Sequence, residues 1–245
     1  MTKSNESGFT DVHCHLLPAV DDGAADGGSA REQIGIAAAD GISRIFFTPH
    51  VRSPWLRRPW SEVEEAFSQM REWCAEAYPG LKLYLGSEFA FSESILREEP
   101  EKIRDMNGSG ILLVEFKPRD SFERIVNACQ QVQMAGYDVL LAHAERYDCM
   151  LEKPERARRI AELGVSIQIN CDDIVRPAGF GMKRFLKLLL KEHLADMAGT
   201  DAHDAKHRRP EMKKAYGIVK KYTDEEYAEQ LFKTNADILC KGKED

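Results

Sequence analysis

The sequence predicts an α/β fold in which a parallel sheet closes into a barrel. Seven short apolar or β-branched runs alternate with segments of helical periodicity along the 245 residues. Such alternation is typical of parallel strands joined by right-handed crossovers, and the even spacing of the runs favours a closed barrel over an open doubly wound sheet. No repeat, low-complexity tract or linker divides the chain. We therefore expect residues 1–245 to form a single domain, with flexible ends at 1–8 and 241–245.

The strand candidates are short runs bounded by polar or turn-forming residues. They cover residues 9–15, 44–50, 81–89, 110–116, 138–145, 165–171 and 195–203. In the first run, Cys14 lies between His13 and His15. Because side chains alternate along a strand, the two histidines are expected to share one face, while Cys14 points to the opposite face and into the core.

Segments with apolar residues at helical spacing fill the intervals between these runs. They cover residues 29–42, 61–78, 121–136, 154–164 and 181–194, and two terminal helices are expected at 210–222 and 224–240. Ser29 and Glu32 have the spacing of a capping box, which predicts a helix start at Ser29, and Gly41 is suited to the helix end. The segment 181–194 is expected to be a core-facing helix rather than a membrane anchor, because it lacks a long basic amphipathic face.

Composition and charge favour a globular protein without a nucleic-acid partner. The formal net charge is −7, the pI is near 5.6, and the basic residues are dispersed. Residues 1–10 lack the apolar core of a signal peptide, and no segment reaches the roughly 18 apolar residues of a membrane span. We therefore expect a cytoplasmic protein that does not insert into membranes. The six cysteines show no C-x-x-C spacing, so we expect free thiols.

Ionisable residues gather at the carboxyl ends of the strand candidates, which converge on the functional face of an α/β barrel. They are His13, His15, His50, Glu88, Glu115, His143, Asp201 and His203. Taken singly, each histidine could be a packing residue and each carboxylate a helix cap, and Asp21 and Asp22 could be turn formers before Gly23. Taken together, the carboxylates would repel one another unless they were protonated or bound a cation, which favours a metal site. Nitrogen and oxygen ligands without a thiolate suit Mn²⁺, Fe²⁺, Zn²⁺ or Mg²⁺.

Several motifs occur in an order and at spacings that resemble a known family. They are "DVHCHLLPAVDDGA", "FFTPH", "GSEF", "LLVEF", "LAHAERY" and "GTDAH". From about residue 10 to about residue 239, the chain resembles the PHP (polymerase and histidinol phosphatase) superfamily, and specifically its bacterial protein-tyrosine phosphatases of the capsule and exopolysaccharide type. The resemblance implies a distorted (β/α)7 barrel with three divalent metal ions, Mn²⁺ first among them, at the carboxyl ends of the strands.

The same resemblance implies a role for each site residue. One ion would take His13, His15, Glu88 and Asp201; a second would share Glu88 and add Glu115 and His143; the third would take Asp22, His50 and His203. Arg146 and Arg208 correspond to arginines that hold phosphate, with the adjacent Arg209 as the alternative to Arg208.

Two features near the site can each be interpreted in more than one way. The loop 51–60, "VRSPWLRRPW", could clamp a phosphotyrosine peptide through Trp55, Trp60 and its arginines, or could be a solvated loop whose tryptophans pack on neighbours. A general acid is not evident from the sequence, and Asp204 and His207 are the candidates. A tyrosine leaving group, with a pKa near 10, makes such an acid less necessary.

The implied function is hydrolysis of phosphotyrosine in proteins by attack of a metal-bound hydroxide. The implied partner is the tail of a bacterial tyrosine kinase that regulates capsular or exopolysaccharide synthesis. The alternatives are a small-molecule phosphatase of the histidinol phosphate type and a non-catalytic, metal-stabilised binding module. Cysteine-dependent phosphatases are disfavoured because no cysteine has an arginine six positions later; "CDDIVR" comes one place short. No nucleotide-binding glycine motif is present either.

Overall fold

The computed structural model describes residues 8–52, 58–98 and 100–242. Residues 1–7 and 243–245, which make up most of the ends expected to be flexible, lie outside the described residues. Trp55 also lies outside them, together with the rest of 53–57. The strands are β1 (Phe9–Cys14), β2 (Ile42–Phe47), β3 (His50–Val51), β4 (Lys82–Leu85), β5 (Glu88–Ala90), β6 (Ile111–Glu115), β7 (Asp138–Leu141), β8 (Ser166–Asn170) and β9 (Met197–Gly199).

All seven predicted runs contain a strand, and two of them contain two strands each. The run 44–50 is interrupted between β2 and β3 at Pro49, which has no N–H to donate to a neighbouring strand. The run 81–89 is interrupted between β4 and β5 at Gly86, where a Cβ would lie only 2.6 Å from Met106 Sδ. These breaks let the second strand of each pair continue in a different sheet.

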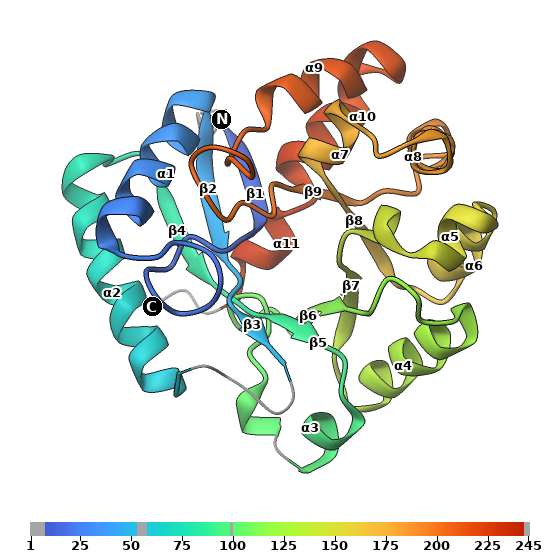
Figure 1. The fold of residues 1–245 in the computed structure, drawn as a ribbon, viewed down its shortest axis with the longest axis horizontal. Coiled ribbons are helices and arrows are strands. Elements are labelled where there is room, and N and C mark those ends of the chain that lie inside the picture. Colours follow the sequence, from blue (N-terminus) through green and yellow to red (C-terminus); the bar gives the residue numbers. More distant parts are fainter. Residues whose placement is uncertain (1–7, 53–57, 99, 243–245) are drawn as a thin grey trace, which may run out of the picture.

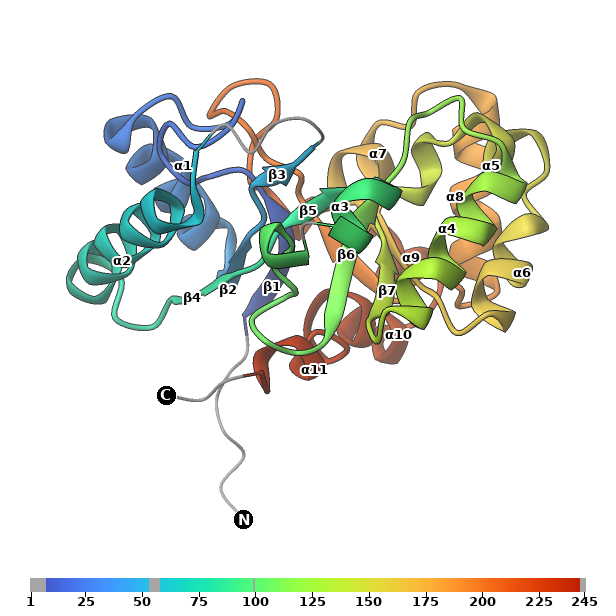
Figure 2. The same cartoon turned by 90° about the horizontal axis from the view of Figure 1, so that it is seen from below.

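The strands form two parallel sheets that together make one curled layer (Figures 1 and 2). β1, β2 and β4 make one sheet in the order β1-β2-β4, and the other strands pair in the order β3-β5-β6-β7-β8-β9. β1 also lies beside the segment after β9 through a parallel bridge between Cys14 and Ala202. There His15 N donates to Ala202 O at 2.8 Å and Asp201 N donates to His13 O at 2.7 Å. The curl brings the first and the last strand together, as an α/β fold of barrel-like type requires.

The helices follow the strands as predicted, with several short additions. They are α1 (Gly27–Asp40), α2 (Trp60–Ala77), α3 (Glu93–Glu98), α4 (Phe122–Met134), α5 (Asp148–Glu152), α6 (Arg156–Glu162), α7 (Cys171–Val175), α8 (Phe180–Lys191), α9 (Lys213–Tyr222), α10 (Glu225–Glu229) and α11 (Asp237–Cys240), with short turns η1 (Pro100–Lys102), η2 (Ala144–Arg146) and η3 (Gln230–Thr234). The predicted helix at 224–240 is thus divided into α10, η3 and α11.

The predicted start of the first helix is wrong, and its predicted end is confirmed. Asp26, not Ser29, caps α1: its side chain accepts from Ser29 N at 2.8 Å, while Asp26 N donates to Ser29 Oγ at 3.1 Å. The capping box therefore pairs Asp26 with Ser29 rather than Ser29 with Glu32. Gly41 ends the helix with φ of 97°, a left-handed conformation that suits glycine.

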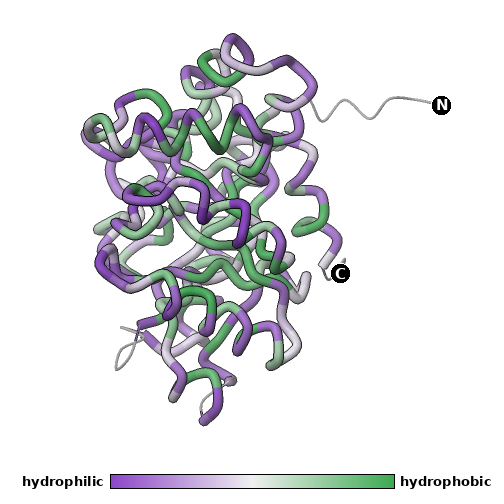
Figure 3. The backbone as a smooth tube through the Cα atoms, turned by 90° about the vertical axis from the view of Figure 1, so that its right-hand side faces the viewer, coloured by the Kyte–Doolittle hydropathy of each residue, from purple (hydrophilic) through white to green (hydrophobic). Residues whose placement is uncertain are grey.

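The helices lie outside the sheet and enclose an apolar interior. α1 and α2 lie on one side, and α4, α5, α6 and α8 lie on the other (Figure 2). Hydrophobic stretches of the chain run through the middle of the molecule, and hydrophilic stretches are frequent on its outer turns (Figure 3). The apolar face of α8 is buried, which confirms it as a core-facing helix; its buried residues are Met182, Phe185, Leu186, Leu189 and Leu190. All six cysteines are free, as expected. Among the described residues, no helix combines the length and apolarity needed to cross a membrane.

Candidate metal centre

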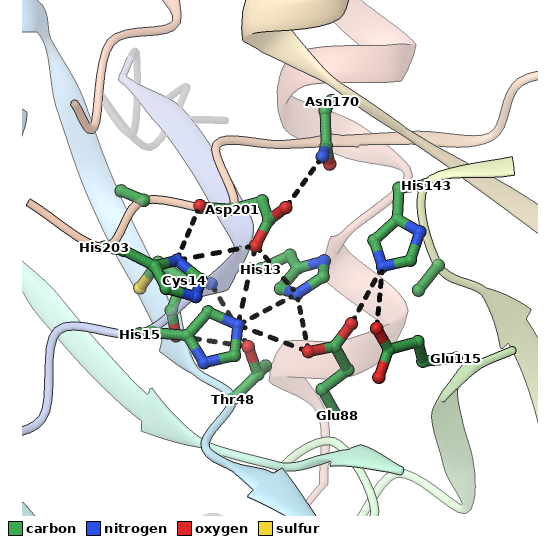
Figure 4. A network of polar contacts seen from close by, with 12 residues as sticks. His13, Cys14, His15, Thr48, Glu88, Glu115, His143, Asn170, Asp201 and His203 are labelled. Atoms are coloured by element: carbon green, nitrogen blue, oxygen red, sulfur yellow. Dashed lines mark hydrogen bonds and ion pairs between the residues drawn. The ribbon is translucent and has the colours of Figure 1, made fainter. Parts of the chain in front are cut away.

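The structure brings all nine predicted metal ligands together at one edge of the curled sheet, where β1, β2, β4, β6, β7 and β9 end, and Figure 4 labels seven of them, all except Asp22 and His50. They come from β1 and the residue after it (His13, His15), the loop before α1 (Asp22), the first residues of β3 and β5 (His50, Glu88), the end of β6 (Glu115), and the segments after β7 and β9 (His143, Asp201, His203). Cys14 points the other way, where its Sγ contacts Phe46 O at 3.3 Å. The alternation predicted for the first strand is therefore confirmed.

Glu88 lies at the middle of the cluster. Its Oε2 atom lies 3.4 Å from His13 Nε2, 3.3 Å from His15 Nε2 and 2.7 Å from His50 Nδ1. Despite these neighbours, Oε2 is buried without a well-directed hydrogen bond in the described part of the chain. The other oxygen, Oε1, lies 3.0 Å from His143 Nε2. A buried carboxylate oxygen with three imidazole nitrogens within 3.4 Å fits a site for a shared cation.

Three groups of ligand atoms lie close enough to hold an ion each. They are His13, His15 and Glu88; His15, Asp22, His50 and His203; and His50, Glu88 and Glu115, with all atoms of a group within 4.8 Å of one another. The donor set contains only imidazole nitrogens and carboxylate oxygens, which suits hard or borderline divalent ions. The residues present therefore fit the metal ions that the sequence implies.

These groups agree with the implied ligand sets except for two residues that belong to an additional group and two that belong to none. His15 also joins the group around Asp22, and His50 also joins the group around Glu115. Two predicted ligands, Asp201 and His143, are outside the three groups. Asp201 Oδ1 nevertheless lies 3.7 Å from His13 Nε2 and 3.6 Å from His15 Nε2. His143 Nε2, which the resemblance pairs with Glu115, lies 3.8 Å from Glu115 Oε1.

The two carboxylate oxygens of Asp201 face different partners. Oδ1 faces the histidines of β1, whereas Oδ2 is contacted by Arg146 Nη1 at 2.8 Å, Arg208 Nη2 at 2.6 Å and Asn170 Nδ2 at 3.0 Å. Its φ of 52° is left-handed, as is the φ of 31° at His143. Strained backbone at two non-glycine residues of one cluster is typical of functional sites. The donors on Oδ2 fix the carboxylate so that only Oδ1 remains directed at the centre.

Gln168 holds two of the histidines in place. Its Oε1 lies 3.1 Å from His13 Nδ1 and accepts from His143 N at 2.8 Å. With the Nδ1 proton of His13 held by this amide, Nε2 is the nitrogen that faces the centre and that can bind a metal ion once it has lost its proton, which is the usual arrangement around metal-binding histidines. Gln168 Nε2 in turn donates to Asn170 Oδ1 at 2.8 Å. Sequence reasoning missed both residues, although two amides at alternate positions of an otherwise apolar strand were a usable signal.

Asp21 does more than form a turn. Its Oδ2 lies 2.7 Å from His15 Nδ1 and accepts from His50 N at 3.2 Å, while its Oδ1 accepts from Gly23 N at 3.0 Å. Burial alone would raise the pKa of Asp21, but the hydrogen bond with His15 outweighs burial and lowers the pKa to about 2. A fifth carboxylate is therefore ionised beside the four in the predicted ligand set.

The carboxylates of the centre raise the pKa values of two of its histidines. Burial alone would lower the pKa of His13, but Glu88 and Asp201 outweigh burial and raise it to about 9. Burial opposes protonation of His50 as well, and there Asp22 and Glu88 raise the pKa to about 10. Protons and divalent cations therefore compete for the same negative charge.

A pocket of about 180 Å³ opens over the cluster. Its lining includes Arg146 and Arg208, and also Arg52, which sequence reasoning did not single out as a site residue. Arg52 Nη2 lies 2.6 Å from His50 Nε2. Arg209 is directed elsewhere, since its Nη2 lies 3.0 Å from Glu211 Oε1. Of the two adjacent arginines, Arg208 is thus the one at the pocket.

Two questions left open by the sequence concern the role of Trp60 and the identity of a general acid. Trp60 is buried at the start of α2, where its Nε1 donates to Lys102 O at 2.8 Å, so it packs on a neighbouring turn and does not clamp a ligand. Neither Asp204 nor His207 lines the pocket. Partial burial would raise the pKa of Asp204, but the backbone N–H groups of His207 and Lys206 outweigh burial and lower it, which makes Asp204 a poor proton donor.

Comparison with known proteins supplies the family. Residues 9–241 match the family model for capsular polysaccharide synthesis, CpsB/CapC. The tyrosine-protein phosphatase CpsB of Streptococcus pneumoniae is 29% identical over 231 residues, which are 92% of this chain and 95% of that protein. The tyrosine-protein phosphatase YwqE of Bacillus subtilis strain 168 is 27% identical over 235 residues, 95% of this chain and 92% of that protein.

Solved structures agree with the sequence comparison. A chain from the crystal structures of Bacillus subtilis YwqE and Streptococcus pneumoniae CpsB, described as metal-dependent tyrosine phosphatases, superposes with a TM-score of 0.85 at 25% identity, covering 96% of this chain and 95% of that one. Histidinol phosphate phosphatase from Lactococcus lactis shares the fold, with a TM-score of 0.57 at 18% identity over 88% of this chain and 94% of that one. Since the family model spans residues 9–241, nearly the whole sequence, the chain belongs to the CpsB/CapC family of capsular polysaccharide synthesis proteins.

Proposed function

We propose that this chain is a metal-dependent protein-tyrosine phosphatase. The observation that carries the proposal is the convergence of imidazole and carboxylate ligands beneath one pocket whose rim holds arginines. Metal ligands and arginines together suit a phosphate monoester, because its dianion can meet cations and planar guanidinium groups at once. The relatives named above are tyrosine-protein phosphatases, which supports phosphotyrosine as the ester.

In this proposal residues 1–245 are one domain, and the curled sheet is a distorted (β/α)7 barrel in which the Cys14–Ala202 bridge joins the last strand region to the first. Three divalent ions, Mn²⁺ first, with Fe²⁺, Zn²⁺ or Mg²⁺ as alternatives, occupy the centre. They are held by His13, His15, Asp22, His50, Glu88, Glu115, His143, Asp201 and His203. Divalent ions bound there would activate a water nucleophile and neutralise charge on the phosphoryl group.

Arg146 and Arg208 are proposed to bind and orient the phosphate. Arg146 uses Nε for Asp173, at 3.0 Å, and Nη1 for Asp201, at 2.8 Å, which fixes the plane of its guanidinium. Because an arginine carries five N–H donors, each side chain keeps donors for phosphate oxygens after these contacts are made. A planar group held in this way loses little conformational entropy when the substrate arrives.

Charge favours an anionic substrate in an otherwise acidic protein. The predicted ligand set has four carboxylates, and ionised Asp21 adds a fifth. Three divalent ions would exceed these five negative charges by one, and the two arginines raise the excess to three. A phosphate dianion would therefore be attracted to the pocket although the formal net charge of the chain is −7.

The leaving group and the aromatic lining fit tyrosine. Phe116 and Tyr147 line the pocket, and the Tyr147 hydroxyl is occupied, since it donates to Ala142 O at 2.8 Å and accepts from Phe116 N at 3.2 Å. Burial raises the pKa of Tyr147 well above its usual value, so this hydroxyl stays protonated. Tyr147 has no exposed surface, so Phe116, which is 5% exposed, is the aromatic side chain of the two that a substrate ring can reach. A phenolate leaves more readily than an alkoxide, which reduces the need for a general acid.

The physiological partner we propose is the tail of a bacterial tyrosine kinase that controls capsular or exopolysaccharide synthesis, encountered in the cytoplasm. The family description, capsular polysaccharide synthesis, supports this setting. The second candidate, a small-molecule phosphatase of the histidinol phosphate type, is supported only by a shared fold. A silent metal-stabilised module would retain the ligands without turnover.

The test is phosphate release from a tyrosine-phosphorylated peptide and from histidinol phosphate by the Mn²⁺-loaded protein, with and without chelator. We expect faster release from the peptide and loss of release in chelator and in His50→Ala. As a matched control, His193→Ala removes an exposed histidine that stacks on Tyr227 and should retain activity. Preference for histidinol phosphate would contradict the peptide substrate, and no release from either compound would contradict catalysis itself.

A further inference from the structure

A second cavity adjoins the metal pocket. It has a volume of about 640 Å³ and shares Arg52, Glu115, Phe116 and Pro118 with the pocket of about 180 Å³. A substrate that places a phosphate over the metal ligands can therefore extend out of the pocket across these shared residues. The larger cavity, which we call the side groove, is of a size that ordinarily holds a ligand of its own.

The side groove has an aromatic wall. Phe91, in the segment between β5 and α3, and Phe116, just after β6, have ring centroids 5.8 Å apart at an interplanar angle of 31°. Phe116 is buried, while Phe91 is only partly buried and thus offers ring surface to a ligand. Ser92 and Ser94 add hydroxyl groups along the same wall. Apolar surface with a few polar groups is suited to a polypeptide segment.

The charges of the side groove are mostly satisfied within the protein. Its acidic residue Glu93 lies 3.0 Å from Arg97, and its acidic residue Asp120 lies 3.2 Å from Arg124. Asp120 also accepts from the backbone N of Lys117 at 3.0 Å. Each of these two carboxylates is therefore balanced by an arginine, and Arg124, on α4, is neutralised by Asp120.

Lys117 is different. Its side chain is exposed on the groove and has no ion pair or hydrogen bond in the described part of the chain. Arg52, at the border with the pocket, is half exposed and lies 3.7 Å from Glu115 and 2.6 Å from His50. The charge that the groove offers to a ligand is therefore positive, and Lys117 is its most available cation.

We propose that the side groove binds the polypeptide flanking the phosphotyrosine and that Lys117 selects an acidic side chain in that segment. This inference rests on the proposed phosphatase function and adds a determinant of substrate choice to it. Continuity with the pocket gives the segment its path, the Phe91–Phe116 wall gives it apolar contact, and Lys117 gives charge complementarity. A small phosphate ester would fill the pocket alone and would not reach the groove.

The test compares peptides that carry a non-hydrolysable phosphonate analogue of phosphotyrosine, one flanked on both sides by glutamates and one by lysines. Binding to the Mn²⁺-loaded protein is measured by fluorescence anisotropy. Because an exposed ion pair contributes little, we expect wild type to favour the glutamate peptide by about threefold, and Lys117→Glu to reverse the preference by a similar factor. Both preferences should fade at high salt. Lys221→Glu, an identical change on exposed α9, should leave the wild-type preference unaltered.

Unchanged preference in Lys117→Glu, or failure of both peptides to bind, would overturn the assignment of the side groove. Release of phosphate from free phosphotyrosine, measured on the same wild-type preparation, reports on the proposed function separately. That small substrate should be hydrolysed equally by wild type and Lys117→Glu. A loss of its hydrolysis in Lys117→Glu alone would also overturn the groove, because Lys117 would then act at the pocket.

Discussion

Gln168→Leu should weaken metal binding without removing any ligand. The side chain is fully buried, and its Oε1 serves both His13 Nδ1 and His143 N. Leucine has a similar size but leaves both groups without an acceptor. Each lost hydrogen bond costs about 1 kcal/mol, so the two together cost about 2 kcal/mol, or roughly 30-fold in affinity. This figure falls within the range of about 10- to 100-fold found for residues that orient metal ligands.

The assay is calorimetric titration of Mn²⁺ into chelator-treated protein, with circular dichroism to confirm folding. Gln168→Glu retains an acceptor oxygen and should recover most of the affinity. The matched control is Gln33→Leu, the same substitution at an equally buried glutamine on α1 whose Oε1 has no hydrogen-bond partner in the described residues. A folded Gln168→Leu protein with wild-type affinity for Mn²⁺ would refute the positioning role of Gln168.

Three further outcomes follow from the geometry. Since the pKa of His13 is raised to about 9 and that of His50 to about 10, both histidines are protonated at pH 7.5 in the metal-free protein. Binding of Mn²⁺ should therefore release protons, and the affinity for Mn²⁺ should rise from pH 7 to pH 9. Calorimetric enthalpies of binding that do not depend on the buffer would contradict this. Arg208→Gln should lower kcat/KM for a phosphotyrosine peptide by about 10- to 100-fold, since it removes charged hydrogen bonds, whereas Arg209→Gln should not; equal effects would disprove the choice between the two arginines. Tyr147→Phe leaves Phe116 N and Ala142 O without their partner and should lower the free energy of unfolding by about 2 kcal/mol in urea titrations; an unchanged midpoint would contradict the burial of both groups.

The sequence predicted those features that depend on local pattern. Alternation along residues 9–15 placed His13 and His15 on one face and Cys14 on the other, and the structure has this arrangement. Parallel strands separated by helices must end at one edge, so the histidines and carboxylates at six run ends could be assigned to one site from the sequence. The central position of Glu88 was implied by the family resemblance, and the structure places its two oxygens against histidines of three other strand regions: His13 and His15, His50, and His143.

Features that depend on tertiary contact could not be predicted in this way. The break at Gly86 reflects the close approach of Met106, and the left-handed φ of Asp201 reflects the segment that follows β9 beside β1. The packing of Trp60 could not be predicted from local pattern, because its partner, Lys102, lies 42 residues away. The capping residue Asp26 was hidden by the two glycines after it, which are weak helix formers.

The central claim is that the clustered histidines and carboxylates bind metal ions and that these ions are required for phosphate release from phosphotyrosine. Its most direct test is to titrate Mn²⁺ into chelator-treated protein while measuring bound metal and phosphate release from a phosphotyrosine peptide in the same samples. We expect no release without metal, and activity that rises with occupancy of the centre. Full activity in protein shown to contain no metal would contradict the account.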